Sequence, residues 1–382
     1  MIRSHWVALI VLSLMGTTAS GNFPAEVESP NKNLEVATAD QLRPLAVQGN
    51  AFAQKELGNR YASGQGVTQD YKEAVKWFRL AADQGYARGQ NNLGLMYKSG
   101  SGVPQDFFEA VRLFRLAAAQ GLPQAQYNLG VMYASGNGVT QDYTEAAKWY
   151  RSSANQGLII AIHDLGVLYE KGLGVSADYS EALRLYRTAA ESGATLAQLA
   201  VGRMYGKGIG VAIDYKEAMK WFQLAGSQGD PSALSMIGFM YDSGQGVAPD
   251  AKIAAKYYQM AAEKGDGIAQ NNLGVMYSKG QGVTQDFKEA VKWFRLAAAQ
   301  GHAGALNSLG LRYTNGQGVW PNRVIAYALF SLAAAKNSAK VGDANNNRNI
   351  VAKGMSAGEI EEAQSLTREL EKSGNFLKAL DK

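Results

Sequence analysis

Few residues in this sequence have the type and spacing that metal or cofactor chemistry requires. After residue 20 the chain has only two histidines, His163 and His302, and it has no cysteine. A zinc site needs three or four ligands that come together in the fold, whereas these two histidines lie far apart in the chain. We therefore predict no metal centre, no cofactor and no catalytic residue, and we interpret His163 as a polar surface residue.

Two recurring patterns look like catalytic motifs but lack their requirements. The Gly-x-Gly-Val loops, such as residues 100–103, have neither the lysine of a P-loop nor the strand that precedes a dinucleotide site. An Asp-x-x-Glu pair, such as Asp142 and Glu145, recurs where helices are expected to begin. A capping box therefore explains the pair better than acid–base catalysis does.

These patterns belong to a block of sequence that repeats along most of the chain. One glycine of the block, which we call the anchor glycine, recurs every 36 residues, and a tyrosine follows it by three residues. The eight anchor glycines are Gly58, Gly94, Gly130, Gly166, Gly202, Gly238, Gly274 and Gly310. A period of this length marks a stacked repeat array.

Each block contains two helical patterns. In the third block, Leu129 and Tyr133 lie four residues apart on one face of a first helix. Ala146 and Tyr150 belong to the apolar stripe of a second helix, expected over residues 142–156. We therefore predict that each block is a helical hairpin, with the anchor glycine in its first helix.

A glycine within a helix costs about 1 kcal/mol relative to alanine. We expect close approach of a neighbouring helix to offset this cost. The small residues Ala81, Ala82, Ala117 and Ala118 are expected on the facing side.

The consensus L-G-x-x-Y-x-x-G-x-G-V-x-x-D-Y-x-E-A-x-x-W-x-x-x-A-A-x-Q-G is similar to the Sel1-like repeat (SLR), a relative of the tetratricopeptide repeat. The resemblance covers residues 50–337. It implies an all-α fold, a right-handed superhelical solenoid of about eight helix-turn-helix repeats with terminal caps. It also implies a protein-protein interaction scaffold, with envelope regulation or host-cell interaction as the setting.

Cysteine-rich relatives of this kind suggest an alternative, a cell-wall-active or β-lactam-interacting enzyme. The only Ser-x-x-Lys here is Ser29 to Lys32, and no Ser-Asp-Asn or Lys-Thr-Gly element accompanies it. The chain also lacks the cysteines that form a disulfide in each block of those relatives. We therefore expect a binding protein and not an enzyme.

The two ends of the chain differ from the array. Residues 1–20 have the layout of a signal peptide, with Arg3 before an apolar run that is too short to span a bilayer. Residues 21–38 are expected to be a flexible leader, and residues 39–49 match the second half of a block and so predict an N-terminal half-repeat cap. We expect export through a cleaved signal peptide, which makes the protein periplasmic or secreted, and no stable membrane span.

The eight repeats are assigned to residues 50–337, and residues 338–382 to degenerate C-terminal capping helices. A capping box at Ser356 and Glu359 begins one of these helices, and residues 373–382 are expected to be frayed. The net charge of +5 is spread along the blocks without a run of Lys or Arg. We therefore predict a protein or peptide partner, such as an envelope or host protein, and no nucleic acid.

Since the Leu, Gly and Tyr of each block are needed in the core, the other first-helix positions should line a concave groove. The third to fifth blocks offer an apolar floor with a polar rim, which suits a peptide or a partner helix. The predicted contact residues are Tyr127, Val131, Ile160, His163, Val167, Glu170, Leu196, Leu199 and Arg203. The alternative is that Ile160, Leu196 and Leu199 pack against neighbouring blocks.

Overall fold

The structure is a computed structural model that describes residues 32–336, 344–372 and 376–380, and all regular structure in these ranges is helical. The chain forms two compact units, residues 1–197 and 198–382, which we call the N-terminal and C-terminal units and describe separately. The predicted signal peptide and the predicted leader up to residue 31 lie outside the described residues.

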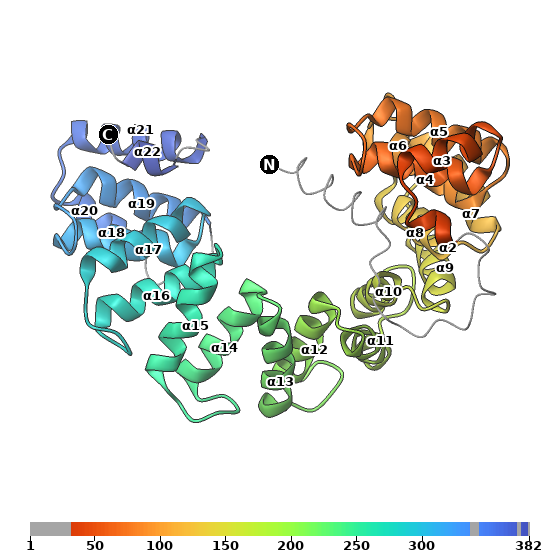
Figure 1. Ribbon diagram of the computed structural model, residues 1–382. Coiled ribbons are helices and arrows are strands. Elements are labelled where there is room, and N and C mark those ends of the chain that lie inside the picture. Colours follow the sequence, from red (N-terminus) through yellow and green to blue (C-terminus); the bar gives the residue numbers. More distant parts are fainter. Residues whose placement is uncertain (1–31, 337–343, 373–375, 381–382) are drawn as a thin grey trace. The chain divides into compact units, whose positions relative to one another are not determined.

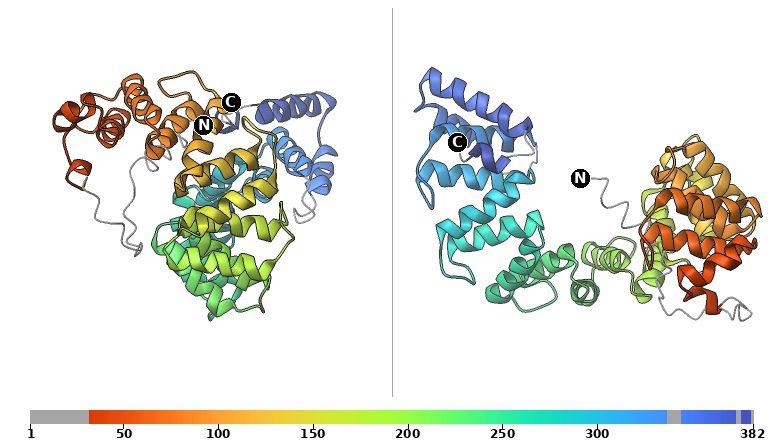
Figure 2. Two further views of the ribbon diagram at one scale, coloured as in Figure 1. Left: turned by 90° about the vertical axis from the view of Figure 1, so that its right-hand side faces the viewer. Right: turned by 45° about the horizontal axis from the view of Figure 1, so that its top comes forward.

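The predicted helical hairpins are confirmed, and within each unit every second helix contacts the first helix of the next block (Figures 1 and 2). The first helices are α4 (Ala51–Ser63), α6 (Ala87–Ser99), α8 (Pro123–Ser135), α10 (Ile159–Lys171), α12 (Thr195–Lys207), α14 (Pro231–Ser243), α16 (Gly267–Lys279) and α18 (Ala303–Asn315). The second helices are α5 (Tyr71–Asp83), α7 (Phe107–Ala119), α9 (Tyr143–Ala154), α11 (Tyr179–Glu191), α13 (Tyr215–Ser227), α15 (Ala251–Glu263), α17 (Phe287–Ala299) and α19 (Arg323–Ala335).

Each second helix begins at an N-cap side chain, but the predicted capping box forms only in part. In the second block, Asp106 Oδ1 accepts hydrogen bonds from the backbone N–H groups of Phe108 and Glu109, at 2.9 and 3.0 Å. The reciprocal bond is absent because the N–H of Asp106 is donated to Tyr97 O at 3.0 Å. Glu109 pairs instead with Arg112, at 2.7 Å.

The anchor glycine packs against an aromatic ring of the second helix in its own block. A Cβ atom at Gly166 would lie 2.9 Å from Tyr186 Cε1. At the other seven anchor glycines a Cβ atom would lie 2.6 to 2.8 Å from the equivalent ring. Real Cβ contacts are longer than this, so only glycine fits. The prediction that alanines face these glycines is therefore wrong. Ala81 does face a different glycine, Gly89, where an added Cβ atom would lie 2.7 Å from the Cβ atom of Ala81.

In six blocks the second glycine of the Gly-x-Gly loop lies against the block before it. Gly100 ends α6 with a left-handed φ of 72°, as a C-cap glycine does. Gly102, with φ of 73°, lies so close to α5 that a Cβ atom would be 2.3 Å from the carbonyl oxygen of Tyr71. The second glycine thus brings the loop against the start of the preceding second helix.

Five of the eight blocks also contain a pair of glutamines, one buried and one exposed, that joins their two helices. In the third block, Gln156 Nε2 donates to Gln126 Oε1 at 2.8 Å and to Gly121 O, in the preceding turn, at 2.9 Å. The five pairs are Gln84–Gln54, Gln120–Gln90, Gln156–Gln126, Gln228–Gln198 and Gln300–Gln270.

At the N-terminal end, packing begins before the half-repeat that the sequence predicts. Helix α3 (Ala39–Val47) is that half-repeat, and a short helix α2 (Lys32–Glu35) precedes it. Leu34 and Ala37 pack in one cluster with Leu42 and Leu57. These two residues of the predicted leader therefore belong to the packed part of the chain.

At the C-terminal end lie α20 (Ala344–Ala352), α21 (Ala357–Lys372) and α22 (Phe376–Leu380). The predicted box before α21 is confirmed, since Ser356 N donates to Glu359 Oε2 at 2.7 Å and Glu359 N to Ser356 Oγ at 3.3 Å. Helix α21 packs on α19 and does not form a close pair with α20. The prediction of a frayed end is wrong for residues 376–380, where Phe376 and Leu380 are buried and α22 contacts α17.

Candidate interaction surface

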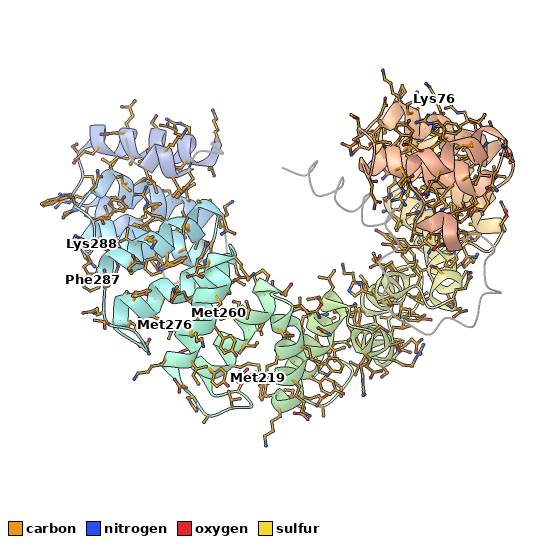
Figure 3. All side chains as sticks on the ribbon, in the orientation of Figure 1. Lys76, Met219, Met260, Met276, Phe287 and Lys288 are labelled. Atoms are coloured by element: carbon orange, nitrogen blue, oxygen red, sulfur yellow. The ribbon has the colours of Figure 1, made fainter. Side chains whose placement is uncertain are left out.

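The first helices leave a set of side chains outside the apolar core. These side chains stand six, three and two residues before the anchor glycine, and one and four residues after it; most of them are partly or fully exposed. We call them the first-helix surface. The outer sides of the second helices carry charged pairs instead, such as Glu73 with Lys76, whose side chain is 67% exposed (Figure 3).

Two of the nine predicted contact residues are clearly exposed, Ile160 at 45% and Leu196 at 64%. The other seven are partly buried: Tyr127, Val131, His163, Val167, Glu170, Leu199 and Arg203. Leu199 packs against the core cluster of the C-terminal unit, as the alternative interpretation predicts, whereas Ile160 and Leu196 remain on the surface.

Asp164 brings two of the predicted residues together. Its Oδ2 accepts a hydrogen bond from the hydroxyl of Tyr127 at 3.0 Å, and its Oδ1 lies 2.9 Å from His163 Nδ1. Tyr127 belongs to α8 and the other two residues to α10, so the carboxylate bridges two neighbouring blocks of the N-terminal unit. The side chains of His163 and Asp164 are 18% and 30% exposed.

Aromatic rings surround this carboxylate. The ring of Tyr127 stacks on Tyr150 with centroids 5.5 Å apart, and the ring of His163 lies 5.4 Å from that of Tyr186. Burial, followed by the negative charge of Asp164, raises the pKa of Tyr127 and of Tyr150 above their ordinary value. Both phenols are therefore protonated at neutral pH, and Tyr127 serves as a hydrogen-bond donor.

Glu170 lies at the other end of α10 and accepts a hydrogen bond from Tyr186 Oη at 2.9 Å. Tyr186 is the ring that packs on the anchor glycine Gly166, so this bond joins the first-helix surface to the core. The predicted residues His163 and Glu170 thus both contact Tyr186. Leu199 and Arg203 belong to the C-terminal unit.

Sequence reasoning missed Asp164 because it considered the position three residues before each anchor glycine, along with positions six before, one after and four after, but not the position two residues before. The neighbouring position, two residues before, holds Asp164 in the fourth block and Met236 in the sixth. Met236 and Phe239 are exposed by 37% and 41%, whereas Ser235 is 5% exposed. Both positions therefore contribute to the surface. They stand four and three residues before the position that follows the anchor glycine, and residues at these spacings share a helix face.

The first-helix positions of the first two blocks hold a buried polar network. Lys55 is 5% exposed and pairs with Glu56, and burial lowers the pKa of its ammonium group. Asn92 Nδ2 donates to Asn59 Oδ1 at 3.0 Å. A chain of amide hydrogen bonds continues from here to Asn91 and to Asn128 in the third block.

The described residues offer no centre for metal chemistry. No three His, Asp or Glu side chains in residues 32–336, 344–372 and 376–380 gather as a metal site requires. His302 begins α18, and its Nδ1 accepts the N–H of Ala305 at 3.2 Å. Among the same residues, no helix is long and apolar enough to cross a membrane.

Successive helical hairpins, each closed by a glycine–aromatic contact between its two helices, define a helical-repeat protein of the α-solenoid class. The sequence model of the Sel1 repeat matches residues 51–86, 87–122, 123–158, 159–193, 195–230, 231–266, 267–302 and 303–338. The chain therefore belongs to the Sel1 repeat family. Proteins built from such repeats are typically protein-interaction scaffolds, and the fold is generally non-catalytic.

Solved structures support this assignment. A Sel1 repeat protein from Oxalobacter formigenes is 34% identical with a TM-score of 0.60, covering 81% of this chain and 86% of that one. A protective antigen of uropathogenic Escherichia coli, described as displaying an SLR fold, is 32% identical with a TM-score of 0.52, covering 90% and 89%. The secretory immunoglobulin A-binding protein EsiB of Escherichia coli is 40% identical over 74 residues, which are 19% of this chain and 14% of that protein.

Proposed function

We propose that this chain is an interaction adaptor, which binds a peptide segment or a partner protein along its first-helix surface. The main support is the variation between blocks that share one fold. The anchor glycine and its tyrosine recur in all eight blocks, whereas the position three residues before the glycine changes. That position holds Lys55, Asn91, Tyr127, His163, Leu199, Ser235, Asn271 and Asn307.

Lys55, Asn91 and Ser235 are buried, so the variation that a partner could meet is that of the other five residues, which are partly exposed. A surface that varies from block to block is suited to a partner whose chemistry changes along its length. The Escherichia coli relative that is named for binding secretory immunoglobulin A is an example of a similar protein with a protein partner.

The proposal includes export, because residues 1–20 have the layout of a signal peptide. Envelope regulation or host-cell contact would then be the setting. Intact mass measurement of the protein from periplasmic and culture fractions tests this step. We expect a chain that has lost a segment ending near residue 20; a chain that keeps residues 1–20 in the cytoplasm would contradict export.

Crosslinking and pulldown from the envelope fraction tests the adaptor function. We expect the double variant Tyr127→Ala and Leu199→Ala to lose partners that the parent retains. A matched control carries Leu116→Ala and Leu224→Ala, which remove apolar side chains exposed by 43% and 48% on second helices. If the first variant is folded by circular dichroism and keeps every partner, the first-helix surface is not the binding site.

A further inference from the structure

Asp164 is a carboxylate that lacks a permanent cation. Its partners are the neutral hydroxyl of Tyr127 and the ring of His163, which is charged only when protonated, and no Lys or Arg pairs with it in the described residues. At the same position in the first block, Glu56 pairs with Lys55 and accepts a hydrogen bond from Asn59 at 3.0 Å. The second and third blocks place neutral Asn92 and Asn128 there. Only Asp164 of these four positions therefore presents a carboxylate without a Lys or Arg partner.

The carboxylate is held in a fixed orientation. Tyr127 bonds one oxygen and His163 lies against the other, so each oxygen keeps a further lone pair. The two groups come from different helices, α8 and α10, and Tyr127 is itself stacked on Tyr150. A carboxylate positioned in this way binds a cation with little additional loss of conformational freedom.

Apolar side chains flank Asp164 on the same helix. Ile160, 45% exposed, lies one turn before Asp164, and Val167 lies three residues after it. Residues at these spacings share one helix face. The exposed face of α10 therefore presents an apolar group, a negative charge and a second apolar group in succession.

We propose that Asp164 binds an arginine side chain of the partner, within a segment that also has apolar residues near that arginine. This inference rests on the proposed adaptor function and specifies the partner's chemistry. Arginine fits better than lysine for two reasons. Its planar guanidinium offers donors to both carboxylate oxygens, and it also stacks on aromatic rings, of which the partly buried Tyr127 lies beside Asp164. The flanking apolar side chains of the segment would lie on Ile160 and Val167.

Peptide selection on the full chain tests this inference. Random phage-displayed peptides about twelve residues long are selected on the parent protein and on Asp164→Asn, which keeps hydrogen-bond acceptance and removes the charge. The control is Asp83→Asn, the same change at an exposed carboxylate at the end of the second helix α5, outside the first-helix surface. We expect arginine enrichment on the parent and the control, and its loss on Asp164→Asn.

A selected peptide is then synthesised with its arginine kept, or replaced by lysine or glutamine, and binding is measured by fluorescence anisotropy. Asp164→Asn should weaken the arginine peptide about tenfold or more and leave the glutamine peptide unchanged. Peptides that bind without arginine preference, or that bind Asp164→Asn and the parent equally, overturn the inference and leave the adaptor function standing. If no peptide and no partner binds the parent, both proposals fail.

Discussion

The N-terminal and C-terminal units share their apolar packing but differ in the polar contacts between their blocks. In the N-terminal unit, arginines of successive second helices donate to the hydroxyl of the tyrosine in the next first helix, at 2.6 to 2.9 Å. These pairs are Arg43–Tyr61, Arg79–Tyr97, Arg115–Tyr133 and Arg151–Tyr169. In the C-terminal unit, Gln223 and Gln259 occupy two of the equivalent positions, and Tyr241 stacks on Tyr257 instead.

The asparagines of the first helices show the same difference. Asn91 Oδ1 accepts a hydrogen bond from Asn128 Nδ2 of the next block at 2.9 Å. In the C-terminal unit the equivalent oxygen, Asn271 Oδ1, is buried without a hydrogen bond in the described part of the chain. The reason is that Ser308 stands where the donor asparagine would be, and its side chain is shorter.

Both units have the glycine–aromatic contact within each block and the buried alanines, so this apolar packing is common to the array. The polar bonds between blocks are additions, present in one unit and partly replaced in the other. A typical hydrogen bond contributes about 1 kcal/mol to the free energy of unfolding, whereas overpacking a core contact costs about 1–3 kcal/mol and occasionally more. This comparison leads to four predictions, in order of decreasing effect.

The largest effect is expected where the two units are alike. Gly166→Leu in the N-terminal unit and Gly274→Leu in the C-terminal unit should each destabilise the protein by about 3 kcal/mol or more. The added side chain meets a ring of Tyr186 or Phe294, which lies 2.9 or 2.7 Å from the position of a Cβ atom. Urea unfolding followed by circular dichroism measures the change.

The control for this prediction is Gly206→Ala in α12. A Cβ atom there would lie 3.7 Å from Ala218 Cβ, an ordinary contact, so helix propensity should stabilise the variant by up to about 1 kcal/mol. A melting temperature of Gly166→Leu within a degree or two of the parent would show that the glycine–ring contact is dispensable.

The asparagine contacts are expected to have the next largest effect. Asn128→Ser leaves Asn91 Oδ1 buried without a donor, which should cost about 1–3 kcal/mol. Ser308→Asn supplies the missing donor to Asn271 Oδ1 in the C-terminal unit and should gain about 1 kcal/mol. Opposite shifts of the urea midpoint support the comparison; shifts in the same direction contradict it.

Replacing arginine by glutamine opposite the tyrosine, or glutamine by arginine, should change the free energy of unfolding by a smaller amount. Arg115→Gln removes the 2.9 Å bond to Tyr133, and Gln259→Arg places an arginine opposite Tyr277. Since these side chains are solvent-exposed, we expect a loss and a gain of about 0.5–1 kcal/mol. Tyr133→Phe keeps the ring and removes the hydroxyl, so it should reproduce the loss seen with Arg115→Gln.

The smallest effect concerns pH. Burial lowers the pKa of His302 from its ordinary value of 6.5, with Asp266 opposing the shift, and the neutral ring accepts the N–H of Ala305. As the pH falls, His302 therefore binds a proton at a higher pH in the unfolded chain than in the folded chain. The free energy of unfolding then decreases below about pH 6.5, by up to about 1 kcal/mol. His302→Asn, which keeps a cap like that of Asn50, should show a smaller decrease between about pH 7.5 and pH 5.5 in thermal unfolding.

The sequence predicts the features that each block determines by itself. The anchor glycine, the tyrosine and the N-cap aspartate recur at fixed positions, so the hairpins and the helix starts follow from local pattern. The cap survives even at Asp250, where Ile253 replaces the glutamate, because the aspartate oxygen alone accepts the two N–H groups. The missing half of the capping box was not predictable, since it depends on the carbonyl of Tyr97 in the first helix.

The candidate site is harder to predict because it depends on contacts between blocks. Asp164 becomes important only when α8 brings Tyr127 against it, and one sequence does not show which of two adjacent helix positions faces a neighbour. The glutamine pairs did leave a signal. Ile162, Leu234 and Leu306 replace the first glutamine in the blocks where Ser192, Lys264 and Lys336 replace the second. This joint replacement predicts a contact between the two positions.

The Gly-x-Gly loop has a consequence for how the chain can change in length. The second glycine of the loop lies mainly against backbone atoms of the block before it, as Gly102 does at Tyr71 O and Gly282 at Ala251 O. Since each of these preceding blocks offers its backbone at the same point, a new predecessor with the same 36-residue period can take that place. Whole blocks can therefore be duplicated or lost during evolution. A gain or loss of part of a block would instead shift its loop away from the start of the preceding second helix.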